Sequence, residues 1–293
     1  MKTLTIFTPT FNRAYCLESL YISLVNQTNQ DFVWLIIDDG STDTTPHLVN
    51  NYNEENKIEI QYVYQENLGM HGAHNCAYRN ITTELNTCID SDDYMPITAV
   101  ADILTCWNNN SDPKIAGIVG LDLDVDNNLI GDKFDSNLKT TTLSEFYENG
   151  GKGDKKMVYR TDVINKYPEY PIFEGEKYVS LAYKYILIDQ DYQLLVLNKP
   201  LVVVEYLIDG SSLNMVSQYL KNPKGFAFIR IVNMQLVKSN SRRFKECIHY
   251  VSSSILSKNS NFIAESPKKL LTILAIPFGL YLYFYIKYKT KKR

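Results

Sequence analysis

The sequence predicts an α/β fold with a mostly parallel central sheet. Short apolar runs alternate with segments of helical spacing through the first 121 residues, and this alternation is typical of βαβ units. Residues 32–37 are almost continuously apolar, as expected of a central strand buried on both faces. Because crossovers between parallel strands are right-handed, we expect the loops that follow the strands to lie along one edge of the sheet.

The first half of the chain divides into regular elements. The expected strands cover residues 4–8, 32–37, 58–64, 85–89 and 115–121, and the expected helices cover 14–26, 44–52, 71–81 and 97–107. Leu17, Leu20 and Leu24 give the first helix its apolar spacing. Asp43 or Thr44 can cap the second helix. We therefore expect a strand and a helix in turn up to residue 121.

The pattern loosens from residue 122. We expect a hairpin-like segment at 122–135, a loop at 149–154, a helix over 176–188 and a strand pair within 194–206 that is broken at residues 198–200. Further helices are expected over 214–221, 225–238 and 242–256, followed by an apolar tail. The second half is therefore predicted to be mainly helical after residue 213.

Composition excludes several classes of protein. The 293 residues are 45% hydrophobic, enough for a full core. A net charge of -3 and the lack of a basic stripe argue against nucleic-acid binding. Five scattered cysteines without a CxxC pair predict reduced thiols, and four histidines disfavour a zinc site. The first seven residues lack signal-peptide features, so we expect a cytoplasmic protein.

An acidic cluster follows the strand at 85–89. Asp90, Asp92 and Asp93 surround Ser91, and three carboxylates this close repel one another unless a cation or hydrogen-bond donors compensate. Oxygen ligands favour Mg²⁺ or Mn²⁺, which proteins commonly share with substrate phosphates. A solvated acidic turn explains the same residues, so the cluster alone does not decide the function.

Polar residues also follow other strands at the same expected edge. They are Thr8, Pro9, Asn12 and Arg13 after the first strand, Asp38 and Asp39 after the second, and Gly69, His71, His74 and Asn75 after the third. Carboxylates after the second strand could bind a nucleobase or ribose, although Asp-Gly-Ser is also common turn chemistry. Gly69 allows a helix N-terminus to meet a phosphate, whereas His74 also fits an ordinary helix surface. Together the strand ends describe a site for a nucleoside diphosphate held through a divalent metal.

These motifs give the chain a family resemblance. The stretches TPTFNR, IIDDGSTD, AHN and DSDD, within about the first 110 residues, resemble the family 2 inverting glycosyltransferases of GT-A fold, which have a Rossmann-like sheet. Later stretches resemble the bacterial cell-surface polysaccharide branch: residues 152–155 with Arg160, residues 173–177 and residues 205–212. The resemblance implies a GT-A domain over residues 1–212, with a nucleotide-binding half (1–121) and an acceptor half (122–212), and a helical extension over 213–293.

The resemblance also implies roles for individual residues. The residues that would bind the nucleotide are Thr8, Pro9, Asn12, Arg13, Asp38, Asp39, Gly69, Asn75, Asp90 and Ser91. The metal would be bound by Asp92 and Asp90 of a DXD element, with Asp93 as the alternative ligand. Lys152, Asp154 and Arg160 would contact the acceptor. Glu176 would be the general base that deprotonates the acceptor hydroxyl, with Glu174 as the alternative. Both glutamates could instead be solvated carboxylates at a helix start. The chain departs from the branch shortly after residues 173–177, where a Pro-Glu pair is expected and the sequence reads Val179-Ser180-Leu181, and at Met70, where a lysine is expected.

The C-terminal tail predicts contact with a membrane. Residues 270–286 form an apolar run with lysines on both sides, but its 17 residues span only about 25 Å, less than the ~30 Å hydrocarbon core. We expect residues 267–293 to lie on the cytoplasmic leaflet; a tilted span and a core or dimer helix are the alternatives.

The sequence thus predicts a cytoplasmic, membrane-peripheral enzyme that uses Mn²⁺ or Mg²⁺. It would transfer a sugar (a hexosyl or N-acetylhexosaminyl group) from a nucleotide-sugar, with UDP-sugars favoured by the resemblance, to a glycan or lipid-linked acceptor. A nucleotidyltransferase and a non-catalytic sugar-nucleotide-binding or scaffold protein are the alternatives.

Overall fold

The structure is a computed structural model that describes residues 2–205 and 215–291. The chain forms two compact units. The first unit comprises Met1–Asn67, Gly72–Glu169 and Lys184–Leu207, and the second comprises Leu68–His71, Tyr170–Tyr183 and Ile208–Arg293. The motif residues 206–212 lie outside the described part of the chain.

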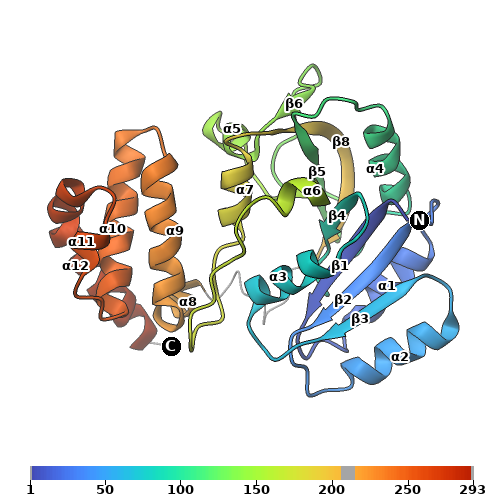
Figure 1. The fold of residues 1–293 in the computed structure, drawn as a ribbon, viewed down its shortest axis with the longest axis horizontal. Coiled ribbons are helices and arrows are strands. Elements are labelled where there is room, and N and C mark those ends of the chain that lie inside the picture. The colour runs from blue at the N-terminus through green and yellow to red at the C-terminus, as the bar shows by residue number, and fades with distance from the viewer. Residues whose placement is uncertain (1, 206–214, 292–293) are drawn as a thin grey trace. The chain divides into compact units, whose positions relative to one another are not determined.

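An eight-stranded sheet forms the centre of the first unit (Figure 1). Its strands are β1 (Leu4–Thr10), β2 (Phe32–Asp38), β3 (Ile60–Tyr64), β4 (Leu85–Cys88), β5 (Ile115–Asp124), β6 (Thr140–Thr141), β7 (Lys155–Arg160) and β8 (Gln193–Val204). The order is β3-β2-β1-β4-β7-β5-β8-β6. Neighbours are parallel except at β4–β7, β5–β7 and β6–β8. The predicted α/β fold with a mostly parallel sheet is confirmed.

Helices cover this sheet. They are α1 (Leu17–Val25), α2 (Thr45–Glu55), α3 (Met70–Asn80), α4 (Ala99–Asn108), α5 (Leu143–Glu148), α6 (Thr161–Ile164) and α7 (Ala182–Ile188). One face of the sheet buries a core in which Ile6 and Trp34 pack with Leu20, Val49 and Ile103 of the helices. Burial of apolar side chains drives this packing. The four helices predicted before residue 108 are all present, as α1 to α4.

Several features of the second half differ from the prediction, which also did not include the short elements β6, α5 and α6. β7 was not expected and lies between β4 and β5. β8 is one strand rather than a broken pair, because Pro200 falls where the β5–β8 register shifts; a bulge tolerates the missing N–H of proline. The helix expected from residue 176 begins only at Ala182, so Glu176 lies in irregular backbone.

The second unit is built mainly from C-terminal helices: α8 (Met215–Lys221), α9 (Pro223–Leu236), α10 (Asn240–Leu256), α11 (Phe262–Glu265) and α12 (Lys269–Lys291). Met234, Tyr250, Val251 and Ala275 form its core. Gly279 of α12 lies so close to α10 that a Cβ there would be 2.5 Å from Val251. The predicted helices are confirmed, and the apolar tail proves to be part of a 23-residue helix.

Candidate active site

The carboxyl ends of β1, β2 and β4 lie at one edge of the first unit's sheet. The last residues of β1 and β2, Thr10 and Asp38, are paired, and Phe7 of β1 is paired with Cys88 at the end of β4. The loops that begin at residues 11, 39 and 89 therefore leave the sheet side by side. Ligands of open α/β sheets bind at this kind of edge.

Side chains tie these three loops together. The backbone N–H of Asn12 donates to Ser41 Oγ (2.9 Å), and Asn12 Oδ1 accepts the N–H of Thr42 (2.7 Å). Asn12 has a φ of 53°, a left-handed conformation that asparagine tolerates. On the other side, Arg13 Nη1 lies 3.9 Å from Asp92 Oδ2. The loop after β1 thus contacts both acidic segments.

Internal hydrogen bonds occupy two of the predicted nucleotide-binding residues. Thr8 is fully buried, and its Oγ1 accepts the indole N–H of Trp34 (3.0 Å). Asp38 is also fully buried; Oδ1 accepts the Ser41 N–H (2.7 Å) and Oδ2 accepts the Tyr62 hydroxyl (2.6 Å). Both side chains therefore stabilise the ends of their strands through internal hydrogen bonds. Asp39 follows in the loop, where its Oδ1 accepts from Gln65 (2.5 Å).

The aspartates of the acidic loop differ in burial. Asp93 is 5% exposed, and its Oδ1 accepts the Glu205 N–H (3.2 Å). Burial raises the pKa of Asp93 to about 7, with a further contribution from the neighbouring charge of Asp90, while Lys156 opposes the rise. Asp90 and Asp92 are only partly buried. The loop therefore contains one enclosed carboxylate and two that are more open to a ligand.

Two charged residues beside this loop were missed by the sequence analysis. Lys156 Nζ donates to the carbonyl of Cys88 (3.2 Å). Asp122 is 3% exposed, and its Oδ1 has no hydrogen-bond partner among the described residues. Burial raises the pKa of Asp122 to about 6, while Lys156 lowers it. Only the pairing of β7 with β5 brings these residues to the acidic loop, and no motif marks it.

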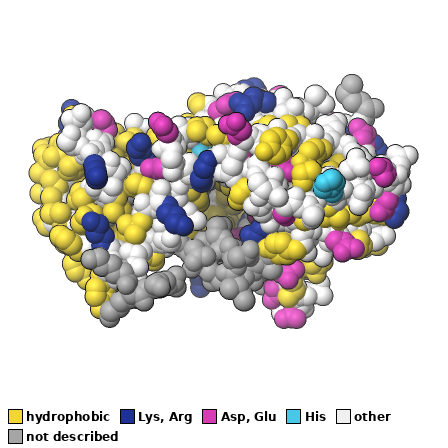
Figure 2. All heavy atoms as spheres, turned by 90° about the horizontal axis from the view of Figure 1, so that it is seen from below, with side chains coloured by type: hydrophobic (Ala, Val, Ile, Leu, Met, Phe, Trp, Pro, Cys, Tyr) yellow, Lys and Arg dark blue, Asp and Glu magenta, His cyan; other side chains and the backbone are white. Residues whose placement is uncertain are grey.

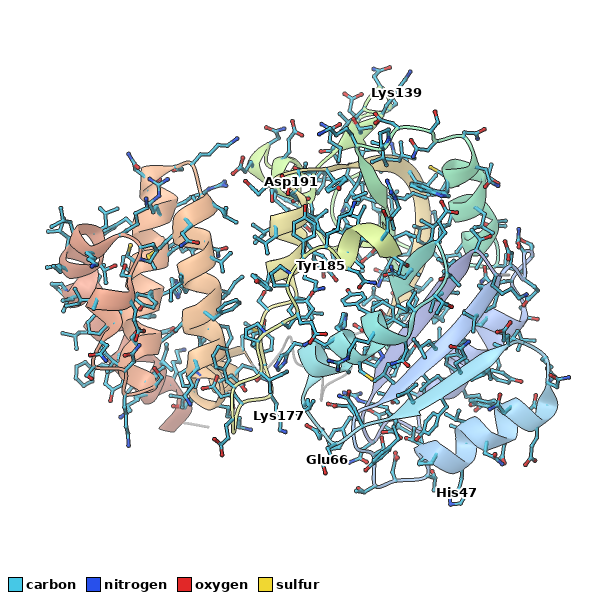
Figure 3. The ribbon with its side chains drawn as sticks, in the orientation of Figure 1. His47, Glu66, Lys139, Lys177, Tyr185 and Asp191 are labelled. Atoms are coloured by element: carbon cyan, nitrogen blue, oxygen red, sulfur yellow. The ribbon has the colours of Figure 1, made fainter. Side chains whose placement is uncertain are left out.

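Tyr185 of α7 is a further residue that the sequence did not indicate (Figure 3). Its ring stacks on Tyr159 of β7 with centroids 5.4 Å apart. Burial raises its pKa, and the nearby Cys88 and Asp90 raise it further. The phenol is therefore a neutral group close to Asp90.

A divalent metal fits the donor chemistry of this loop. In residues 2–205 and 215–291, no three His, Cys, Asp or Glu side chains are grouped so that they could hold a metal. Mg²⁺ commonly takes only one or two carboxylates and completes its shell with phosphate oxygens and water. Asp90 and Asp92 can supply those carboxylates, and the unpartnered Oδ1 of Asp122 adds negative charge nearby.

Four other predicted residues of the first unit are buried. Ser91 and Asn75 are buried, and His74 packs edge-on against Phe7 (centroids 5.1 Å apart). Pro9 is enclosed within β1.

The predicted acceptor residues lie at the two ends of β7: Lys152 and Asp154 precede the strand, and Arg160 is its last residue. Arg160 is paired with Leu85, the first residue of β4, and it contacts Asp162 (2.7 Å). The acidic loop follows the other end of β4, about 16 Å away at 3.3 Å per residue. Arg160 therefore lies at the end of β7 that is remote from the acidic loop, and its contact with the acceptor stays a prediction. Lys152 and Asp154 precede β7 at the acidic edge, in a loop whose carbonyls accept from Lys155.

The second unit holds Gly69, Glu174 and Glu176. Glu176 is 8% exposed, and its two oxygens accept the N–H groups of Lys224 and Gly225 (2.9 Å each) in the first turn of α9. The neighbouring Lys177 N–H donates to Asn222 (2.7 Å; Lys177 is labelled in Figure 3).

Glu176 therefore caps α9 and is not a solvated carboxylate, whereas Glu174 is exposed. Gly69 has a φ of 81°, and a Cβ there would lie 2.1 Å from the Lys177 carbonyl. That close approach requires glycine. His71, also in this unit, is buried with neither ring nitrogen hydrogen-bonded to a described residue.

Comparison with known proteins places this site in a family. The family model of glycosyl transferase family 2 matches residues 5–167, more than half of the chain. A validoxylamine A glucosyltransferase of Streptomyces hygroscopicus subsp. jinggangensis is 44% identical over 68 residues, which are 22% of this chain and 16% of that protein. The chain thus matches less than a fifth of that relative's length.

Solved structures share the fold. TarS of S. aureus (residues 1–349, in complex with UDP-GlcNAc) superposes with a TM-score of 0.61 at 18% identity, covering 94% of this chain and 79% of that one. The mannosyltransferase PcManGT of Pyrobaculum calidifontis, in complex with GDP-Man and Mn2+, gives a TM-score of 0.55 at 17% identity, with 94% and 72% covered. With the family match and this architecture, the chain belongs to glycosyl transferase family 2 and has the GT-A fold.

Proposed function

We propose that the protein is a metal-dependent, inverting glycosyltransferase that takes a sugar from a nucleotide-sugar. The observation that carries this proposal is the meeting of three strand-end loops at one sheet edge, joined through Asn12–Ser41 and Arg13–Asp92. The edge offers carboxylates for a nucleoside and for a cation, and a guanidinium 3.9 Å from Asp92. A nucleoside diphosphate needs this combination of groups.

The structure suggests how the predicted donor residues divide their roles. Asp39 is our candidate for the nucleoside contact, because Asp38 spends both oxygens on Ser41 and Tyr62. Arg13 can turn from Asp92 toward a phosphate, which a guanidinium binds well. Asn12 holds the loop that presents Asp39. Gly69 and Asn75 remain candidates for the phosphate side.

A divalent cation, Mn²⁺ or Mg²⁺, would be held by Asp90 and Asp92, with Asp93 as the enclosed alternative. When bound, it would offset the charge that develops on the leaving diphosphate. The Mn2+ in the complex of PcManGT supports this choice by analogy of fold. Asp93, bonded to Glu205, would hold the loop in place.

The general base comes from Glu174 or Glu176, and the structure favours Glu174. Inverting transfer requires a base that deprotonates the acceptor hydroxyl as the diphosphate leaves. Glu176 already accepts two backbone N–H groups of α9, whereas Glu174 is exposed and free to meet an acceptor. Lys152 and Asp154 are the candidate acceptor contacts in the first unit.

These roles make separate predictions for the two glutamates. We expect Glu174→Gln to keep donor binding and folding but to lose at least about 100-fold in transfer rate, the size of a lost general base. Glu176→Ala should lower the free energy of unfolding by about 1–3 kcal/mol, because two helix N–H groups lose their acceptor. Full activity of Glu174→Gln together with a stable but inactive Glu176→Gln would return the base to Glu176.

The acceptor is proposed to be a glycan or lipid-linked molecule at the inner face of the cell membrane, within cell-surface polysaccharide synthesis. Residues Lys269–Thr290 have the length and composition of a span, with a mean hydropathy of 1.6, and 22% of that window is buried. One face of α12 packs on α10, where Ala275 and Gly279 lie against Val251. The opposite face exposes Leu270 (79%), Leu274, Tyr281 (75%) and Phe284.

Side chains of this face form the hydrophobic edge of the second unit in Figure 2. A helix that is packed on one side and apolar on the other suits the surface of a bilayer rather than its interior. Lysines at 268, 269, 287 and 289 would attract the anionic cytoplasmic leaflet. We therefore propose peripheral attachment through α12.

A donor panel tests the proposed function. The full chain is incubated with UDP- and GDP-sugars and Mn²⁺ or Mg²⁺, and nucleoside diphosphate release is measured with and without membrane extract. We favour a UDP-sugar that carries a hexosyl or N-acetylhexosaminyl group, in keeping with the UDP-GlcNAc bound to TarS. Release of pyrophosphate instead would indicate a nucleotidyltransferase, and binding without release would indicate a scaffold protein.

A further inference from the structure

Lys156 brings a positive charge to the acidic loop, and the proposed function gives it no role. β7 begins at Lys155, which pairs with Leu121 of β5, so Lys156 pairs with Gly120. Its ammonium donates to the Cys88 carbonyl (3.2 Å), two residues before Asp90. The strand register therefore places this ammonium at the point where the acidic loop begins.

Three nearby carboxylates act electrostatically on the Lys156 ammonium. Burial opposes its charged form, but Asp122, Asp93 and Asp90 together raise its pKa. Asp122 and Asp93 are almost fully buried, and Asp122 Oδ1 has no hydrogen-bond partner among residues 2–205 and 215–291. Lys156 is thus the neighbouring counter-charge for two carboxylates that solvent hardly reaches.

We propose that Lys156 is a positioning residue that limits the affinity of the acidic loop for a divalent cation, with Asp122 as its counter-charge. This inference rests on the proposed metal site at Asp90 and Asp92. Lys156 offsets the charge of Asp122 and Asp93, so that their field adds little to the attraction of a cation. The loop then binds the cation firmly only when the diphosphate of the donor contributes its own oxygens.

A charge cycle tests this role. Mn²⁺ binding to the full chain is measured without nucleotide, by the electron paramagnetic resonance signal of free Mn²⁺, at one pH near 8. Lys156→Met should tighten Mn²⁺ binding about tenfold and Asp122→Asn should weaken it about tenfold, the order expected for one charge near a partly screened cation. The double variant should stay within about threefold of wild type, because the two charge changes cancel.

Two further variants serve as controls. Lys156→Arg should bind Mn²⁺ like wild type, since it keeps the charge. Lys166→Met removes a lysine that pairs with Asp162 (3.7 Å), just beyond the end of β7 that lies away from the acidic loop, and it should leave Mn²⁺ affinity unchanged. If Lys166→Met tightens Mn²⁺ binding as much as Lys156→Met does, the loss of any lysine acts through the net charge of the protein, and the proposal is overturned.

The remaining outcomes are also decisive. Weaker Mn²⁺ binding in both Lys156→Met and the double variant would mean that Lys156 only supports the fold of the loop. If Lys156→Met does not fold, Asp122→Asn and the double variant still complete the comparison: a weakening that the double variant does not restore contradicts the proposal. Wild-type protein that binds no Mn²⁺, even with UDP, would instead contradict the metal site of the proposed function.

Discussion

Two consecutive aspartates show how residues of one motif separate into different roles. Asp38 ends β2 with both oxygens engaged by Ser41 and Tyr62, whereas Asp39 lies one residue further along, in the loop. A sequence motif gives the two carboxylates the same weight. Both residues are buried, at 0% and 4% exposure, so the difference lies in their hydrogen bonds and backbone: Asp38 is the last residue of β2, whereas Asp39 belongs to the loop.

We expect Asp38→Asn and Asp39→Asn to have opposite consequences. An amide at position 38 would place an N–H group against a donor, so Asp38→Asn should lower the free energy of unfolding by about 1–3 kcal/mol. Asp39→Asn keeps an oxygen that can accept from Gln65, so it should change stability less than Asp38→Asn and weaken binding of the nucleoside diphosphate about tenfold or more. Urea unfolding and calorimetric titration with UDP measure the two effects; the reverse pattern would exchange the assigned roles.

Asp122 predicts a pH dependence of stability. Its folded-state pKa of about 6 lies above its ordinary value of 3.8. The folded protein therefore keeps a proton that the unfolded chain has released, so the free energy of unfolding falls as the pH rises from about 4 to about 6.

Asp122→Asn should lack this fall. We expect the variant to exceed wild type in stability by about 1–3 kcal/mol near pH 8 and to match it near pH 4, when unfolding is measured in urea with a chelator present. Asp90 and Asp93 still accompany Lys156 in this variant. Equal stability differences at both pH values would contradict the buried, proton-linked state of Asp122.

At the scale of elements, β7 is the strand that the sequence did not predict, and the positions of several site residues depend on it. The predicted strands at 4–8, 32–37 and 85–89 follow from local apolar runs, and their acidic ends meet as expected. β7 pairs antiparallel with both β4 and β5, and this pairing depends on tertiary contacts rather than on any local pattern. Lys156, Asp122 and the remote position of Arg160 all depend on β7, so the sequence could not place them.

The capping role of Glu176 was hidden for a similar reason. The sequence offered a run of helical spacing from residue 176, but the segment up to Leu181 instead packs against the N-terminus of α9. The contact joins residues almost fifty positions apart. The long-range cap forms instead of a local helix, and such a tertiary contact cannot be predicted from local helical spacing.

The packing of α12 on α10 makes a testable prediction at this scale. A Cβ at Gly279 would meet Val251 at 2.5 Å and the Ile248 carbonyl at 3.0 Å. Gly279→Ala should therefore lower the free energy of unfolding of the second unit by about 1–3 kcal/mol through overpacking. Leu280→Ala, at a more exposed neighbouring position, is the matched control. Equal and small effects of both variants would show that the two helices are not in close contact.

At the scale of the whole molecule, α12 links the enzyme to its surroundings. Deleting residues 267–293 would also remove Ala275 from the core of the second unit, so point substitutions on the exposed face are a cleaner test. Leu274→Asp with Phe284→Asp should move the protein from the membrane fraction to the soluble fraction, since each charge opposes insertion into the interface. Ile97→Asp, an exposed apolar position in the first unit, should not. Unchanged membrane association would contradict attachment through α12.

The central claim is that the edge formed by β1, β2 and β4 binds a nucleotide-sugar through the acidic loop and releases its diphosphate. The most direct measurement is nucleoside diphosphate release from a panel of UDP- and GDP-sugars with Mn²⁺ or Mg²⁺, comparing wild type with Asp92→Asn. We expect at least one donor to give release that a chelator abolishes and that Asp92→Asn reduces at least about 100-fold. Release that persists at the wild-type rate in Asp92→Asn, or no release from any donor, would contradict the claim.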